Sequence, residues 1–156
     1  MRRYLTRALW LGLAVLVIAQ AFRIDTTNPP IQQDVAAPPA VAAVLRRACY
    51  DCHSNETVWP WYSQVAPISW LLERDAREGR EELNFSVWNT YEAKKRAKKL
   101  QETAEEVAEG EMPPWLYVVA HRDAALSQAD VELLRAWAME GRSALSPFRP
   151  PRMEVR

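Results

Sequence analysis

The feature that most constrains this chain is the pentapeptide C-Y-D-C-H, which holds both cysteines of the 156-residue sequence and one of its two histidines. Three potential ligand side chains so close together indicate that one bound group uses all of them. The spacing C-x-x-C-H is the attachment signature of haem c. Two thiols at the end of a helix can reach the two vinyl groups of one porphyrin, and the adjacent imidazole can face the iron. The motif therefore predicts one covalent haem c on Cys49 and Cys52, with His53 as an iron ligand.

Three other chemistries use the same residue types. A thioredoxin-like thiol pair is expected beside a βαβ pattern, which this sequence lacks. A zinc site with two cysteines and two histidines would need His53, directly beside Cys52, together with the distant His121. A structural disulfide over so short a loop would restrain little chain entropy. All three fit the motif less well than haem c does.

A sixth iron ligand would have to come from one of four side chains: Met112, His121, Met139 or Met153. Met139 falls inside the last predicted helix and Met153 in the C-terminal tail, which leaves two candidates. Met112 stands in G-E-M-P-P-W, where two prolines stiffen the loop and remove amide donors. His121, in V-V-A-H-R-D, could ligate iron, donate to a propionate or lie on the surface. Met112 is the preferred ligand and His121 the alternative.

The identity of this ligand decides the function. A Met/His pair favours reduced iron and suits electron transfer, whereas two histidines lower the potential. The sequence therefore predicts a single-electron carrier rather than an enzyme. If neither side chain bound, the open iron could meet peroxide or a diatomic gas, and the protein would be a haem-based sensor or a weak peroxidase.

The N-terminal segment, residues 1–24, has the composition of an export signal. Three arginines precede an uncharged run of fifteen residues, Ala8 to Phe22. This run is shorter than the roughly 18 to 20 residues that span a bilayer, although flanking arginines can snorkel. We expect a retained single-pass inner-membrane helix with the following domain in the periplasm. The alternative is cleavage after Ala21, since Ala19-Gln20-Ala21 has the small-x-small form of a processing site.

The rest of the chain is predicted to be helical, because no alternating strand pattern occurs in it. Residues 25–40 contain two Pro-Pro pairs and predict an extended tether, residues 41–145 the domain, and residues 146–156 a disordered tail. We expect a helix from about residue 41 into the motif, and one from Ile68 to Glu78 closed by Gly79. Two more follow: one capped by Ser86 or Asn89 and closed by Gly110, and one between Ser127 and Gly141.

Formal net charge is zero, so charge suggests no nucleic-acid partner. Basic residues nevertheless cluster in one place, with five cations in six positions: Lys94, Lys95, Arg96, Lys98 and Lys99. A solvated helix face explains them simply. The other hypothesis is a docking surface for an acidic redox partner or anionic lipid.

Several longer stretches resemble the bacterial haem-binding domain family of membrane-anchored, single-haem c-type proteins. They are D-T-T-N-P-P, C-Y-D-C-H-S-N-E-T-V-W-P-W-Y-S-Q-V-A-P-I-S-W-L, E-G-R-E-E-L-N-F-S-V-W, G-E-M-P-P-W-L-Y and H-R-D-A-A-L-S. The first long block is much more specific than C-x-x-C-H alone. Together the stretches span roughly residues 26–127.

This resemblance implies haem attached at Cys49 and Cys52, proximal ligation by His53, and a domain similar to the cytochrome c fold. In that fold the N- and C-terminal helices cross and a late loop supplies the distal methionine, a place that Met112 matches. The family pattern also carries a histidine at the position of His121. The run that contains Trp59 and Trp61 would line the haem edge, although a core role is equally compatible. Redox proteins in or at the membrane would be the partners.

Overall fold

The computed structural model of the chain describes residues 1–145. The predicted tail, residues 146–156, and Met153 within it lie outside the described residues. Over residues 1–145 the chain forms helices and no strand, and its one β-bridge joins Gln33 to Val87. The prediction of an all-α fold is therefore confirmed.

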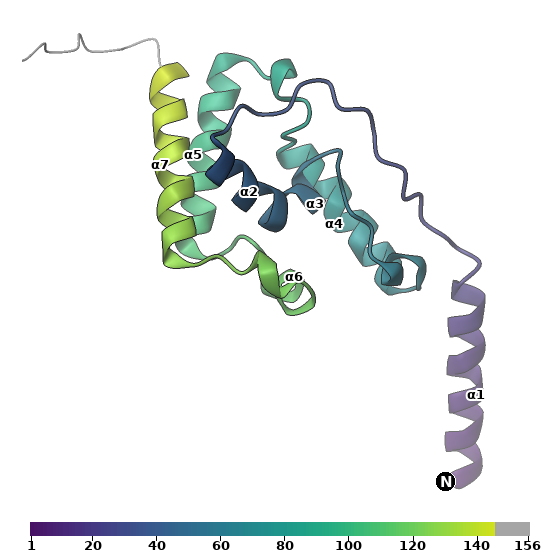
Figure 1. Cartoon of the computed structure of the whole chain (residues 1–156). Coiled ribbons are helices and arrows are strands. Elements are labelled where there is room, and N and C mark those ends of the chain that lie inside the picture. Colours follow the sequence, from purple (N-terminus) through teal and green to yellow (C-terminus); the bar gives the residue numbers. More distant parts are fainter. Residues whose placement is uncertain (146–156) are drawn as a thin grey trace, which may run out of the picture.

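The first helix, α1 (Arg2–Ala19), extends away from the remaining helices (Figure 1) and buries none of its residues. Its apolar side chains, such as Leu9, Trp10 and Leu11, are exposed. Among the helices of residues 1–145, none combines the length and apolar character needed to cross a membrane. The helix itself forms where the sequence predicts one, but its membrane-spanning character is not confirmed.

The main core lies under α2 (Pro39–Ala48), which leads directly into the short α3 (Tyr50–His53). A proline at the start of α2 suits the first helical turn, where an amide donor would have no partner. The apolar positions of α2 fall on one face at helical spacing, and all four are buried: Val41, Val44, Leu45 and Ala48. This face packs with Phe85, Val107 and Leu134, so α2 ties the motif to the C-terminal half of the chain.

Two long helices, α5 (Ala93–Glu109) and α7 (Gln128–Leu145), lie side by side and run antiparallel (Figure 1). Leu100 and Ala104 of α5 are buried against Ala138 of α7. Small side chains let the two helix axes approach closely, as the alanine-rich stripe of α5 predicts. Residues of α7 also contact α2, which therefore lies across the helix pair.

Some predicted helix ends are confirmed and others are wrong. Gly110 closes α5 in the left-handed region, with φ +78°. Ser127 and Asp130 begin α7 with reciprocal hydrogen bonds, in which each side chain binds the other residue's amide at 2.9 to 3.2 Å. These bonds, with Arg47 of α2 at 2.7 Å, lower the pKa of Asp130 to about 2. The α2–α7 crossing is thereby held by a charged contact at the start of α7.

Three corrections concern the other helix ends. α4 (Ile68–Glu82) continues past Gly79, and α7 continues past Gly141, so neither glycine ends its helix. Both lie against a close neighbour: the backbone of Cys52 leaves no room for a side chain at Gly79, and the end of the Leu100 side chain lies beside Gly141. Neither Ser86 nor Asn89 caps α5, because the residue before its first turn is Glu92 and its side chain makes no capping bond.

The proline-rich segment, residues 25–40, is extended but does not stand apart from the domain. Asn28 donates to the carbonyl of Thr57 at 2.9 Å, and the carbonyl of Pro30 accepts from Asn55 at 2.9 Å. Asp34 accepts the hydroxyl of Tyr50 at 2.7 Å. The segment predicted to be a tether therefore runs alongside residues 50–57 and is held to them by these hydrogen bonds.

Most of the basic cluster on α5 is engaged within the chain. Lys98 and Lys99 pair with Glu102 at 3.1 and 2.8 Å, and Lys99 also approaches Glu82 at 3.5 Å. Lys95 lies 4.2 Å over the ring of Tyr91. These contacts favour the explanation of a solvated, internally paired face over that of a docking surface.

Candidate haem attachment site

The two cysteines lie on the same side of one helical turn. The backbone bends at Cys49, between α2 and α3, and the amide of His53 donates to the carbonyl of Cys49 at 2.9 Å. Residues three positions apart in a helical turn are neighbours, so Cys49 and Cys52 lie beside each other on that turn. Neither cysteine forms a disulfide. Burial raises the pKa of Cys49 to about 12 and that of Cys52 to about 11. Both sulfurs are therefore neutral thiols near pH 7, unlike the activated thiolate of a redox pair.

The imidazole of His53 is held by one nitrogen only. Its Nδ1 lies 2.9 Å from the carbonyl oxygen of Gly79 and 3.1 Å from that of Leu83. A carbonyl only accepts, so Nδ1 carries the proton and donates, which leaves the lone pair on Nε2. No hydrogen bond within residues 1–145 reaches Nε2, and burial lowers the pKa of the ring. The side chain is thus a neutral, oriented imidazole, the form that binds metals.

Gly79 allows α4 to approach α3 closely enough for these bonds. A Cβ at this position would lie 2.6 Å from the carbonyl oxygen of Cys52 and 3.0 Å from its Cβ. No side chain fits in that space. The carbonyls that hold His53 come from the last turn of α4 and the residue that follows it, so the glycine sets the position of the His53 imidazole.

The loop after α5 carries Met112, which is half-buried and whose amide donates to the carbonyl of Glu106 at 3.3 Å. This loop leads into α6 (Trp115–Ala120). The hydroxyl of Tyr117 in α6 donates to Asp51 Oδ2 at 2.7 Å, and the other oxygen of Asp51 accepts from the amide of Val58 at 2.9 Å. Since Asp51 stands between the two cysteines, the segment that carries Met112 is bonded to the attachment motif itself.

His121 is half-buried at the end of α6, and both of its ring nitrogens have neighbours. Nε2 lies 3.1 Å from the hydroxyl of Tyr62, and Nδ1 lies 3.3 Å from the carbonyl of Tyr117. Its ring also stacks on that of Tyr117, with centroids 4.3 Å apart. To bind iron, this imidazole would have to give up at least one of these contacts.

The two tryptophans of the aromatic loop differ in environment. Trp61 is 81% exposed and meets the ring of Tyr62 edge to face. Trp59 is half-buried and lines a hollow of about 330 Å³ along α4, and its buried indole Nε1 has no hydrogen-bond partner among residues 1–145. The hollow is lined by Asp25, Pro29, Trp59, Glu73, Ala76, Arg77, Arg80 and Glu81.

Large apolar side chains are exposed on the segments around the motif. Val58 lies just before η1 (Trp61–Gln64), and Trp61 begins it. The others lie on α6, and they are Trp115, Leu116 and Val119. The contact between Tyr62 and His121 joins these segments. Exposed apolar side chains on adjoining segments are a feature of binding sites.

The residues present therefore fit a haem group. Two neutral thiols stand in one turn, and the imidazole of His53 makes no hydrogen bond through Nε2 within residues 1–145. Exposed apolar side chains lie on the segment that follows the motif and on α6. Within residues 1–145 no three His, Cys, Asp or Glu side chains are grouped to hold a metal ion directly. Cys49, Cys52 and His53 would hold the group, and Met112, on the loop that leads into α6, is the candidate for a further ligand.

Asp51, Gly79 and Tyr117 are site residues that sequence reasoning missed. Gly79 carried a signal, because an isolated glycine within a helical pattern often marks a close approach. The signal at Asp51 was weaker: it is an acidic residue that stands between the two cysteines of the motif. Nothing in the sequence pairs Asp51 with Tyr117, which lies 66 positions away.

Comparison with known proteins gives one match. The model of the haem-binding domain family matches residues 14–140, which is most of the chain. Neither the curated proteins nor the solved structures contain a match. From the match over residues 14–140 and the attachment motif within it, the chain belongs to the haem-binding domain family.

Proposed function

We propose that the protein binds one haem c covalently and transfers single electrons. The observation that best supports this is the state of His53, whose Nδ1 donates to two backbone carbonyls while Nε2 is free. That arrangement stands within one turn of two neutral thiols. A cytochrome c-like arrangement is part of the proposal, supported by α2 lying across α7 and by the methionine loop before the last helix.

Each residue would have a separate role. Cys49 and Cys52 hold the macrocycle through thioether bonds, and His53 binds iron through Nε2. Hydrogen bonds from Nδ1 to the carbonyls of Gly79 and Leu83 make the imidazole a stronger donor and fix its plane. When bound, haem c supplies a one-electron iron couple, whose potential is set by axial ligation and burial.

We assign the sixth ligand to Met112, because His121 is already occupied by Tyr62 and Tyr117. In Met112→Ala we expect the methionine-to-iron charge-transfer absorption of the ferric protein to disappear and the reduction potential to fall. His121→Ala should keep that absorption. An optical spectrum and a redox titration of both variants measure this, and loss of the band in His121→Ala alone would reverse the assignment.

Tyr117 is proposed as a positioning residue that binds the methionine loop to the motif through Asp51. Tyr117→Phe removes only the hydroxyl and its 2.7 Å bond, a charge-assisted bond worth about 1.5 to 3 kcal/mol. We expect the methionine-to-iron absorption to weaken, and added imidazole to bind ferric iron about tenfold more tightly than in the wild type. Covalent haem content should be unchanged.

The matched control is Tyr62→Phe, which removes a hydroxyl bonded to His121 instead. It should leave imidazole affinity near that of the wild type. Equal affinities in the wild type and both variants would show that the bond to Asp51 does not position the ligand.

Carbon monoxide separates an electron carrier from the alternative, a sensor or weak peroxidase with a displaceable ligand. A carrier with methionine bound should be oxidised and reduced reversibly and should bind carbon monoxide slowly when reduced. Rapid binding by the reduced wild type, or peroxide turnover, would instead support the alternative. The partners we propose are redox proteins in or at the membrane.

Export to the periplasm is part of the same proposal. It is supported by three arginines before the uncharged run and by the exposure of the large apolar side chains of α1. Fusion of a reporter enzyme to the C-terminus, active only outside the cytoplasm, tests it. An inactive fusion that is fully expressed would contradict it.

A further inference from the structure

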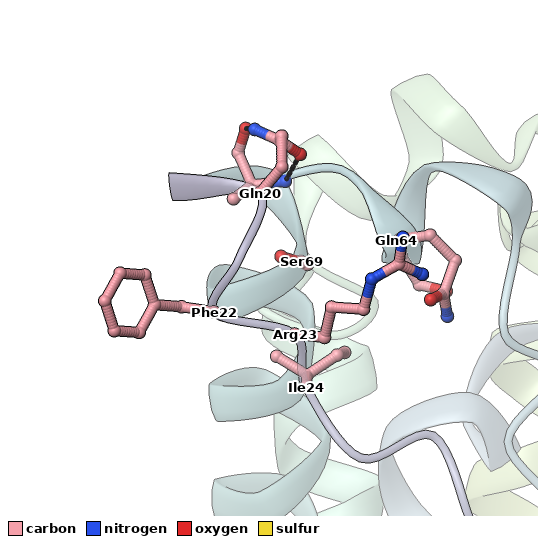
Figure 2. Close-up of a pocket in the computed structure, with 8 residues that line it drawn as sticks. Gln20, Phe22, Arg23, Ile24, Gln64 and Ser69 are labelled. Atoms are coloured by element: carbon pink, nitrogen blue, oxygen red, sulfur yellow. Dashed lines mark hydrogen bonds between the residues drawn. The ribbon is translucent and has the colours of Figure 1, made fainter. Parts of the chain in front are cut away.

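The end of α1 is bonded to the haem-binding domain by a pair of reciprocal hydrogen bonds. The side-chain nitrogen of Gln20 donates to the carbonyl of Ala66 at 3.1 Å, and the amide of Ala66 donates to the side-chain oxygen of Gln20 at 3.0 Å. One glutamine thus satisfies both backbone polar groups of Ala66, a residue that is only 5% exposed. Figure 2 shows Gln20 on the chain directly above Phe22 and the start of α4.

The residues that follow continue this contact. The indole Nε1 of Trp70 donates to the carbonyl of Phe22 at 2.9 Å. The side chains of Arg23 and Ile24 lie along the same corner of the molecule, beside Gln64 and Ser69 (Figure 2). Residues 20–24 therefore pack on the loop and first turn of α4, and they are not a free connection between α1 and the domain.

We propose that residues 20–24 are an integral part of the folded domain, so that the mature protein keeps them and the bond between Ala21 and Phe22 is not cut. Cleavage there would remove Gln20 and with it both hydrogen bonds to the backbone of Ala66, each of which contributes to stability. The small-x-small sequence at Ala19-Gln20-Ala21 then belongs to a structural junction.

The junction also links α1 to the iron-binding residue. The first turn of α4, which Phe22 contacts through Trp70, begins the helix whose far end provides the carbonyls of Gly79 and Leu83 to His53. A single helix thus connects the end of α1 with the imidazole. The domain is held in one orientation relative to α1, and it cannot turn freely as it would on a flexible tether.

The N-terminus of the mature protein tests the proposal. The full chain is expressed with a haem-maturation system, and the intact mass of the purified product is measured. We expect a mass that includes residues 20–24. A product that begins at Phe22 would overturn the proposal, whatever its haem content, so this result is independent of the proposed electron transfer.

Substitution of Gln20 tests the hydrogen bonds themselves. Gln20→Ala should lower the midpoint of thermal unfolding by about 5 °C, since the two hydrogen bonds to Ala66 are lost. The matched control is Gln64→Ala, because Gln64 is exposed and lies at the same corner of the molecule, and its midpoint should stay within about 1 °C of the wild type. Equal midpoints for the two variants would show that the junction does not contribute to the fold.

Discussion

The double variant Cys49→Ala/Cys52→Ala is expected to contain no haem that survives denaturing electrophoresis, whereas the wild type gives a haem-stained band. These are the only cysteines of the sequence, so no other thiol can form a thioether bond. His53 would remain, held by the carbonyls of Gly79 and Leu83. A single imidazole binds haem only reversibly, so the pigment should be extracted by acidified organic solvent.

The control is Met139→Ala, which removes an exposed sulfur-containing side chain from α7. It should keep the full haem stain. Wild-type protein that gave no band after expression with a maturation system would contradict covalent attachment. A band of wild-type strength in the double variant would also contradict it.

Gly79→Ala is expected to lower the free energy of unfolding by about 1 to 2 kcal/mol. Replacing a helical glycine by alanine normally stabilises a helix by about 1 kcal/mol. Here the new Cβ would lie 2.6 Å from the carbonyl oxygen of Cys52, and such overpacking costs about 1 to 3 kcal/mol or more. The clash involves backbone on both sides, so α3 and α4 must separate, and the hydrogen bonds of His53 lengthen with them.

Gly141→Ala is the matched control, since Gly141 also lies inside a helix. Its added Cβ would meet Leu100 Cδ1 at 2.9 Å, the end of a flexible side chain that can rotate away. We expect stability equal to that of the wild type or up to about 1 kcal/mol higher. Chemical denaturation of both variants measures the difference. Equal stabilities would show that the α3–α4 contact tolerates a side chain, and the special role of Gly79 would have to be abandoned.

The helix pattern followed from local sequence where one face of a helix meets the core. The four apolar positions of α2 are all buried, and Gly110 and Ser127 end and begin helices as predicted. The predicted helix ends at Gly79 and Gly141 were wrong. A glycine in a helical pattern can either end the helix or allow a neighbouring segment to approach, and the local sequence does not distinguish the two. The neighbours concerned lie 27 and 41 positions away, and they cannot be found from local pattern.

The sequence by itself determined that the domain is helical and that both thiols and one imidazole stand within five residues, because helical periodicity and motif spacing are local properties. Only the tertiary structure decided which nitrogen of His53 carries the proton, because the carbonyls that accept from it belong to α4. It also decided that Tyr117 bonds to Asp51 and that Gln20 satisfies Ala66. These contacts depend on how distant segments pack, and many different sequences would satisfy the same local patterns without forming them.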